Sequence, residues 1–169
     1  MRADRWLKLL YHYPDHAFPT LLAHIAHFGA RVGYQGPIVR VRSSNHSSVY
    51  RIPNEITQSI QDELAAGRIA RVSSLPLFFF VSPLGAIEKE ANGVHTGWRR
   101  FHDLSFPRGA SVNDGIPEHL GTLQYQTLED AIRLIALTGR YAILRKRDLK
   151  DAFRMIPISI YDYWLFLFE

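Results

Sequence analysis

The chain has 169 residues, with 20 Lys and Arg against 16 Asp and Glu, no cysteine, and hydrophobic side chains at 47% of its positions. This length and apolar content suit one folded domain with a buried core and exclude a disordered tail. Without cysteine, the chain can form neither a disulfide scaffold nor a cysteine-ligated zinc or iron–sulfur site. No apolar run approaches the roughly 18 residues that span a bilayer, and charged residues occupy the region where a signal peptide would be apolar. We therefore expect an intracellular protein, in the cytoplasm or nucleus, that is not secreted and has no membrane partner.

Basic side chains are concentrated towards the two ends of the sequence. Residues 1–53 carry seven basic and two acidic side chains, residues 54–130 carry six and ten, and residues 131–169 carry seven and four. Such a positive field suits a polyanion such as nucleic acid, because neutralising phosphates releases their counterions. A solvated protein surface explains the same charges, so charge alone identifies no partner.

The first half of the chain predicts two helices, an arm and a strand. A short helix is expected from Leu21 to Phe28, ending at Gly29. The stretch from there to Pro53 is rich in Gly, Ser, Arg and Asn, which predicts a loop or extended arm. Apolar residues four positions apart then predict a helix from Glu55 to Ala66 with Asn54 as its N-cap. The apolar run at 77–81, bounded by prolines, predicts a buried strand.

The second half predicts a hairpin, a structured loop and a further helix. Gly85–Lys89 and Trp98–Leu104 read as strands, joined by a long tip that contains an Asn-Gly turn signal. Phe106–Pro117 is dense in Gly, Pro, Asn and Asp, which is typical of a structured loop. A capping-box pattern then predicts a helix from Leu128 to Thr138. A strand is expected to begin at Tyr141 and to lead into the charged cluster around residue 148.

Asp148 is the strongest candidate for chemistry. It follows the expected strand, and a second carboxylate, Asp151, comes three positions later. A carboxylate at the end of a buried strand is costly unless it binds a cation, accepts hydrogen bonds or reaches water, and Mg²⁺ prefers such hard oxygen ligands. The backbone amides of residues 150–153 could in addition cradle a phosphate. The alternative is that both aspartates only cap a helix, and spacing alone favours that alternative.

Two longer motifs point to a family. RKRDLKDAFRMIPI, residues 145–158, resembles the first catalytic motif of reverse transcriptases, and WRRFHDLSFPRGASVNDGIP, residues 98–117, resembles the fingers motif that precedes it. The second motif is particularly similar to the enzymes of DIRS- and Ngaro-type retrotransposons, and the resemblance covers about residues 30–169. It implies an α+β fold, a truncated right-hand polymerase with a fingers subdomain and an incomplete palm sheet. The regions would be a basic N-terminal helix and extended arm (1–53), fingers (54–126) and the start of the palm (127–169).

The resemblance also implies roles for the residues of the first catalytic motif. Asp148 matches the first metal-binding aspartate, and the backbone carbonyl of Leu149 would be a second ligand. The amides of Asp151 and Ala152 would meet the triphosphate of the incoming nucleotide. Phe153 matches the aromatic residue that stacks under the sugar and excludes a 2′-hydroxyl, the group that distinguishes RNA from DNA.

In the fingers region, the resemblance assigns Lys89 and Arg99, one from each strand of the hairpin, to the basic pair that closes on the triphosphate. A guanidinium can hold phosphate oxygens through two parallel bonds, whereas lysine acts as a point charge. An ordinary surface lysine remains an alternative for Lys89, which has acidic neighbours on both sides. Arg100 leaves the register of Arg99 open by one position. Asp103 matches a family residue that we expect to be structural.

The chain lacks the double-aspartate motif that supplies two of the three metal-binding carboxylates in the family. Tyr161-Asp162-Tyr163-Trp164 resembles that motif only superficially and is expected to be a turn before a further strand at 164–168. We therefore expect a fragment, without the C-terminal palm and thumb, that is inactive alone. The intact parent would use two Mg²⁺ ions, an RNA template, a DNA primer and deoxynucleoside triphosphates. The alternatives are a non-catalytic nucleic-acid-binding remnant and a relic without a stable fold.

Overall fold

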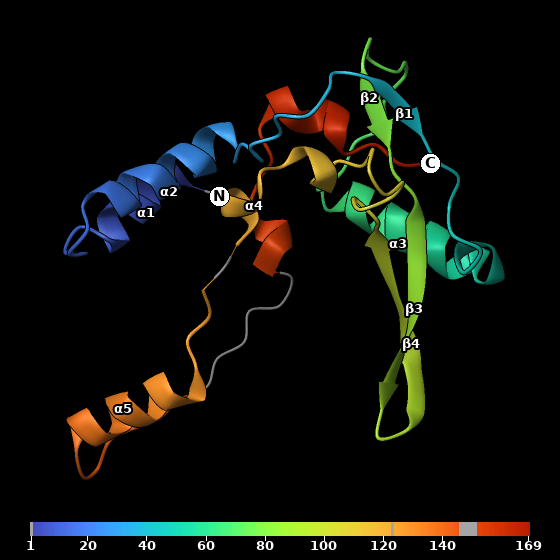
Figure 1. Cartoon of the computed structure of the whole chain (residues 1–169). Helices are drawn as coiled ribbons and strands as arrows, with labels where there is room; N and C mark the ends of the chain where they lie inside the picture. Colours follow the sequence, from blue (N-terminus) through green and yellow to red (C-terminus); the bar gives the residue numbers. More distant parts are fainter. Residues whose placement is uncertain (1, 123, 146–151) are drawn as a thin grey trace.

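The computed structural model describes residues 2–122, 124–145 and 152–169. It is a mixed structure of helices and strands, which confirms the α+β composition in its general form (Figure 1). The α-helices are α1 (Ala3–Leu9), α2 (Ala17–Phe28), α3 (Pro53–Ala65), α4 (Glu118–Gly121) and α5 (Leu128–Thr138). The strands are β1 (Arg40–Arg42), β2 (Phe79–Val81), β3 (Leu84–Ala91) and β4 (Val94–His102). Short 3-10 helices are η1 (Val49–Arg51), η2 (Asn113–Gly115), η3 (Ala152–Met155) and η4 (Ile160–Leu165).

The antiparallel pair β3–β4 is the longest regular feature of the sheet structure, and it projects from the rest of the chain in Figure 1. Its two strands meet at Asn92 and Gly93, which both have positive φ, 53° and 75°. Two such residues form the two-residue turn whose twist matches that of the flanking strands. The predicted hairpin is therefore confirmed, but its predicted long tip is wrong because the strands continue to the turn.

A small parallel sheet lies at the base of the hairpin. β1, from within the predicted arm, pairs with β2, and Leu167 joins β2 through Val81. The predicted strand at 77–81 is thus confirmed only over its last three residues. The predicted strand at 164–168 is largely wrong, since Trp164 and Leu165 belong to η4 and only Leu167 forms a bridge. Apolar composition there reflects burial in a 3-10 turn, with Leu165 fully buried, rather than a strand.

Two clusters of buried side chains form the core. One lies between α3, η1 and the base of β3, and the other lies around β2. Their buried members are Val49, Ile52, Ile56, Leu84 and Ala86 in the first cluster, and Phe80, Val112 and Leu165 in the second. Each of the three predicted regions, 1–53, 54–126 and 127–169, contributes residues to these clusters.

The helix predictions are confirmed with shifted ends. α2 ends at Gly29 as expected but begins at Ala17, four residues earlier than predicted. α3 begins at Pro53, so Asn54 is not its N-cap, because proline has the φ of a first helical residue and lacks the N–H that would be unpaired there. Within the parts of the chain described, no helix combines the length and apolarity needed to cross a membrane.

α5 matches its prediction in both bounds, and its predicted capping box is present. The strand expected to follow it, from Tyr141 to Leu144, is wrong: these described residues form no strand. Tyr141 has a φ of 72°, and the side chains of Tyr141, Ile143 and Leu144 are exposed. An isolated strand is not stable in water without a partner and an apolar face to bury, and the described chain gives this segment neither.

Candidate functional site

The β3–β4 hairpin presents one open face with two cations. Lys89 pairs with Gly97 and Arg99 pairs with Ile87, so the regular alternation of the strands places Lys89 and Arg99 on the same face as diagonal neighbours. Both side chains are exposed. Among the described residues, neither forms an ion pair. The structure therefore places on one face the two cations that the resemblance assigns to a pair.

Arg100 lies on the opposite face of the hairpin and is committed to the core. Its Nε donates to Ser59 Oγ of α3 at 3.2 Å, and its guanidinium lies 5.3 Å from the centre of the Phe168 ring. Burial lowers the pKa of Arg100, and the nearby charge of Arg154 lowers it further, while Glu63 opposes both. The two adjacent arginines thus have different environments, and only Arg99 is available on the open face with Lys89.

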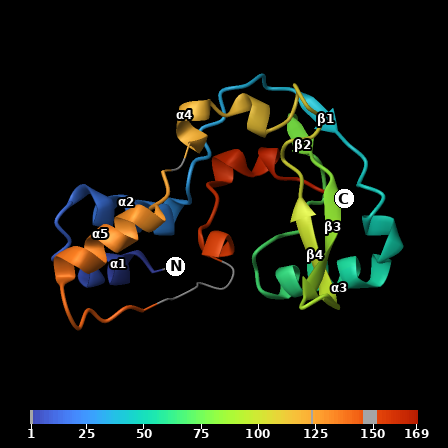
Figure 2. The ribbon, with the colours of Figure 1, turned by 60° about the horizontal axis from the view of Figure 1, so that its bottom comes forward.

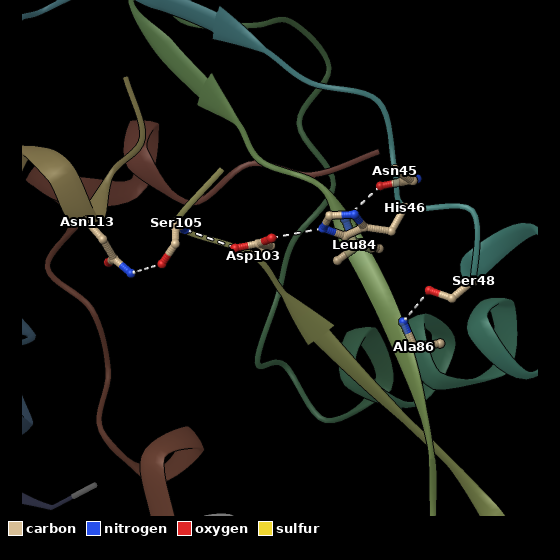
Figure 3. A network of polar contacts seen from close by, with 8 residues as sticks. All are labelled: Asn45, His46, Ser48, Leu84, Ala86, Asp103, Ser105 and Asn113. Carbon is tan, nitrogen blue, oxygen red and sulfur yellow. Dashed lines mark hydrogen bonds and ion pairs between the residues drawn. The ribbon is translucent and has the colours of Figure 1, made fainter. Parts of the chain in front are cut away.

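The base of the hairpin is held by side chains of the arm (Figure 3). Asn45 Oδ1 accepts from the Leu84 amide at 2.7 Å, and Ser48 Oγ accepts from the Ala86 amide at 3.0 Å. These bonds give partners to two amides at the start of β3, on the edge that does not face β4, where they would otherwise be unpaired. The hairpin consequently has a fixed orientation relative to the arm and α3.

Asp103, expected to be structural, connects β4 with the arm and with the loop that follows. Its Oδ2 lies 2.8 Å from His46 Nε2, and its Oδ1 accepts from the Ser105 amide at 3.1 Å. Asn113 Nδ2 then donates to Ser105 Oγ at 2.8 Å (Figure 3). His46 was not predicted, because its partner lies 57 positions away and no local pattern marks it.

A buried carboxylate on α3 anchors η3, which lies within the first catalytic motif. The Glu63 side chain is only 8% exposed, and its Oε1 contacts both Arg68, at 3.5 Å, and Arg154. Arg154 belongs to η3, so this ion pair attaches η3 to α3. Glu63 was missed, although a signal exists: it lies seven residues after Ile56 and three after Ile60, on the apolar face of the helix.

The catalytic motif, residues 145–158, is described only in part. Asp148, Leu149 and Asp151 lie outside the described residues. Ala152 and Phe153 are described only as backbone of η3. Within residues 2–122, 124–145 and 152–169, no three His, Asp or Glu side chains gather as metal ligands.

Asp162, from the segment that superficially resembles a double-aspartate motif, serves the fold. Its side chain is 4% exposed and receives Arg31 Nε at 3.0 Å and the Val32 amide at 2.9 Å. A carboxylate bound in this way is already neutralised and hydrogen-bonded within the protein. It therefore ties η4 to the arm rather than facing an open site.

Comparison of the chain with protein-family models, with curated proteins and with solved structures found no match.

Proposed function

We propose that this chain is part of the RNA-directed DNA polymerase of a DIRS- or Ngaro-type retrotransposon, comprising fingers and the start of the palm. In this interpretation, the β3–β4 hairpin binds the triphosphate of the incoming deoxynucleotide through Lys89 and Arg99. The observation that carries the proposal is that these two cations, ten residues apart in sequence, share the open face of a hairpin whose other arginine is packed inside.

The arrangement suits phosphate binding. Arg99 can hold two phosphate oxygens in a planar fork, and Lys89 adds a point charge that follows the ligand. Since neither has a carboxylate partner in the described chain, no internal ion pair must be broken first. The fixed base of the hairpin, held by Asn45 and Ser48, limits the conformational entropy that binding would cost.

The chemistry of the parent needs more carboxylates than this chain supplies. The resemblance assigns one metal-binding aspartate, Asp148, and the sequence has no double-aspartate motif. When bound, magnesium would polarise the phosphates and activate the primer hydroxyl. The 169 residues alone should therefore bind nucleotide without extending a primer, and measurable primer extension by the purified chain would contradict the fragment interpretation.

The test is the affinity of the chain for the magnesium complex of a deoxynucleoside triphosphate, measured by calorimetric titration. Lys89→Gln and Arg99→Gln should each weaken binding about tenfold, because each removes a charge-assisted hydrogen bond of roughly 1.5–3 kcal/mol. Arg71→Gln, which removes an equally exposed arginine outside the hairpin, is the matched control and should leave affinity unchanged. The proposal would be overturned if the unsubstituted chain did not bind the triphosphate, or if Arg71→Gln lost as much affinity as the hairpin variants.

A non-catalytic nucleic-acid-binding protein is the second candidate. The exposed hairpin cations favour it, since binding to a phosphate backbone needs none of the absent carboxylates. The basic arm supports it less, because Arg40 Nε donates to the Leu77 carbonyl at 2.6 Å and Arg42 pairs with Glu169. Two results together would select this candidate. Lys89→Gln and Arg99→Gln would lose affinity for a primer–template, and the unsubstituted chain would not bind the triphosphate.

A further inference from the structure

The helical pair α1–α2 carries two adjoining surface hollows that the hairpin does not use. α1 packs along α2, and the turn between them lines the hollows. Leu7, Tyr11 and His12 line both hollows. Lys8 completes the first hollow, and the second continues to the start of α2, with Leu10, Tyr13, Pro14, His16, Pro19 and Thr20.

The rings in these hollows are unusually accessible. Tyr11 is 73% exposed, and its ring meets His12 edge to face with centroids 5.0 Å apart. Tyr13 is 41% exposed, and its ring centre lies 5.1 Å from that of Phe18. An exposed tyrosine face contributes little to the core, but it offers a flat apolar surface on which another ring can stack.

The charges beside the rings favour an anionic partner. Both carboxylates of α1–α2 are already engaged: Asp4 accepts from Arg2, which lowers the pKa of Asp4, and Asp15 accepts from the Ala17 amide at 2.9 Å. Arg5 and Lys8 are exposed and form no ion pair within the described chain. They lie three residues apart on α1, so they are neighbours on one side of the helix.

We propose that α1–α2 is a binding surface for single-stranded nucleic acid. Bases stack on Tyr11 and His12, and the phosphates between them contact Lys8 and Arg5. Stacking accepts every base, and neither contact reads the 2′ position, so DNA and RNA strands bind alike. This surface is separate from the nucleotide contact proposed for the hairpin and does not depend on it.

An apolar protein groove or a lipid surface fits these residues less well. A neutral protein groove or a neutral lipid surface supplies no anion for Arg5 and Lys8, so these side chains would lose water without gaining a new partner, which is costly. A polynucleotide supplies both bases to stack on the rings and phosphates to contact Lys8 and Arg5. Duplex DNA also fits less well, because its bases are already stacked on one another.

The test uses the full chain and fluorescently labelled oligothymidylate and oligouridylate of about 12 nucleotides, within the range of known single-strand sites. Binding is measured by fluorescence anisotropy at several salt concentrations. Tyr11→Ala should weaken binding of both strands at least about fivefold, whereas Tyr11→Trp should restore it, because a stacked base is worth about 1–3 kcal/mol. Lys8→Gln should weaken binding and reduce the salt slope, log affinity against log salt, by about 0.7.

Two control variants distinguish the α1–α2 surface from a general disturbance of α1 and from a general loss of positive charge. Leu9→Ala removes an exposed apolar side chain of α1 that lines neither hollow. This variant should bind the single strands as tightly as the unsubstituted chain does. Arg71→Gln, which removes an exposed arginine outside both proposed surfaces, should also leave the single-strand affinity unchanged. Unchanged binding in Tyr11→Ala, equal losses in Leu9→Ala, or a preference for duplex or anionic vesicles over single strands would overturn the proposal.

Discussion

His102 shows how one partly buried side chain couples this fold to pH. Its Nε2 donates to the Leu167 carbonyl at 3.2 Å, and its ring centre lies 5.4 Å from that of Phe168. Burial lowers the pKa of His102, and the charge of Arg100 lowers it further, while the carbonyl contacts and Asp103 oppose the shift. The folded chain therefore keeps this histidine neutral at a pH where the unfolded chain already binds a proton.

The sign of the pH dependence follows from this difference. As pH falls through about 6.5, the unfolded state gains a proton that the folded state does not, so the free energy of unfolding decreases. The decrease attributable to one proton is at most about 1.4 kcal/mol per pH unit. We expect His102→Gln to flatten the dependence of urea unfolding on pH between about 7.5 and 5.5. An unchanged slope in this variant would show that His102 does not titrate in this way.

At the scale of elements, α5 is specified almost entirely by its own sequence. The Thr127 side chain accepts from the Asp130 amide at 3.2 Å, and Asp130 Oδ2 in turn accepts from the Thr127 amide at 2.9 Å. The bonds that the Asp130 carboxylate accepts from the Thr127 amide and from the Thr127 hydroxyl lower the pKa of Asp130. No α5 side chain is buried, so within the described chain local hydrogen bonds, rather than packing, define this helix.

Removing the cap should therefore unravel α5 without unfolding the molecule. Thr127→Ala is expected to cost about 1 kcal/mol of helix stability, which should appear as faster hydrogen exchange at the first amides of α5. Thr138→Ala, at the other end of the same helix, is the matched control and should leave those amides unchanged. Loss of the global unfolding transition in Thr127→Ala would contradict a purely local role for the cap.

Long-range contacts define the whole molecule. The segment after α2 pairs with the segment before η4: the Ala30 amide donates to the Pro157 carbonyl at 2.8 Å, and the Ser159 amide donates to the Ala30 carbonyl at 2.9 Å. The Arg31–Asp162 ion pair lies beside this contact. The start of the arm, just after α2, lies beside the red C-terminal segment in both views (Figures 1 and 2), and the contacting residues are about 130 positions apart in the sequence.

Asp162→Asn tests the contribution of this closure. The variant keeps the size of the side chain but removes its charge, which weakens the bonds from Arg31 Nε and the Val32 amide. We expect the free energy of unfolding in urea to fall by about 2 kcal/mol, since hydrogen bonds to charged groups contribute roughly 1.5–3 kcal/mol. Asp62→Asn, at an exposed carboxylate bonded only to Gln58 among the described residues, should change it by less than about 0.5 kcal/mol. If both variants lowered the free energy of unfolding equally, the contact between the arm and η4 would add little to stability.

Features that depend on neighbouring residues could be predicted from the sequence, whereas features that depend on distant partners could not. The hairpin turn, the C-terminal end of α2, both ends of α5 and its capping box depend on residues within a few positions, so their local patterns were sufficient. The strands expected at 141–144 and 164–168 depend on partners elsewhere, and apolar composition could not reveal whether such partners exist. For the site, the resemblance paired Lys89 with Arg99 and the strand register places both on one face, whereas Glu63 and His46 depend on distant partners that no motif marks.

Gly29 illustrates what the closure requires. Its φ is 81°, and a Cβ atom there would lie 2.5 Å from the backbone of Ile158 and Ser159. Two stretches of main chain touch here without a side chain between them. During synthesis, α2 and the arm leave the ribosome well before residues 157–162 have been translated. Until then, the main chain around Gly29 lacks its partner and remains exposed to solvent and to chaperones.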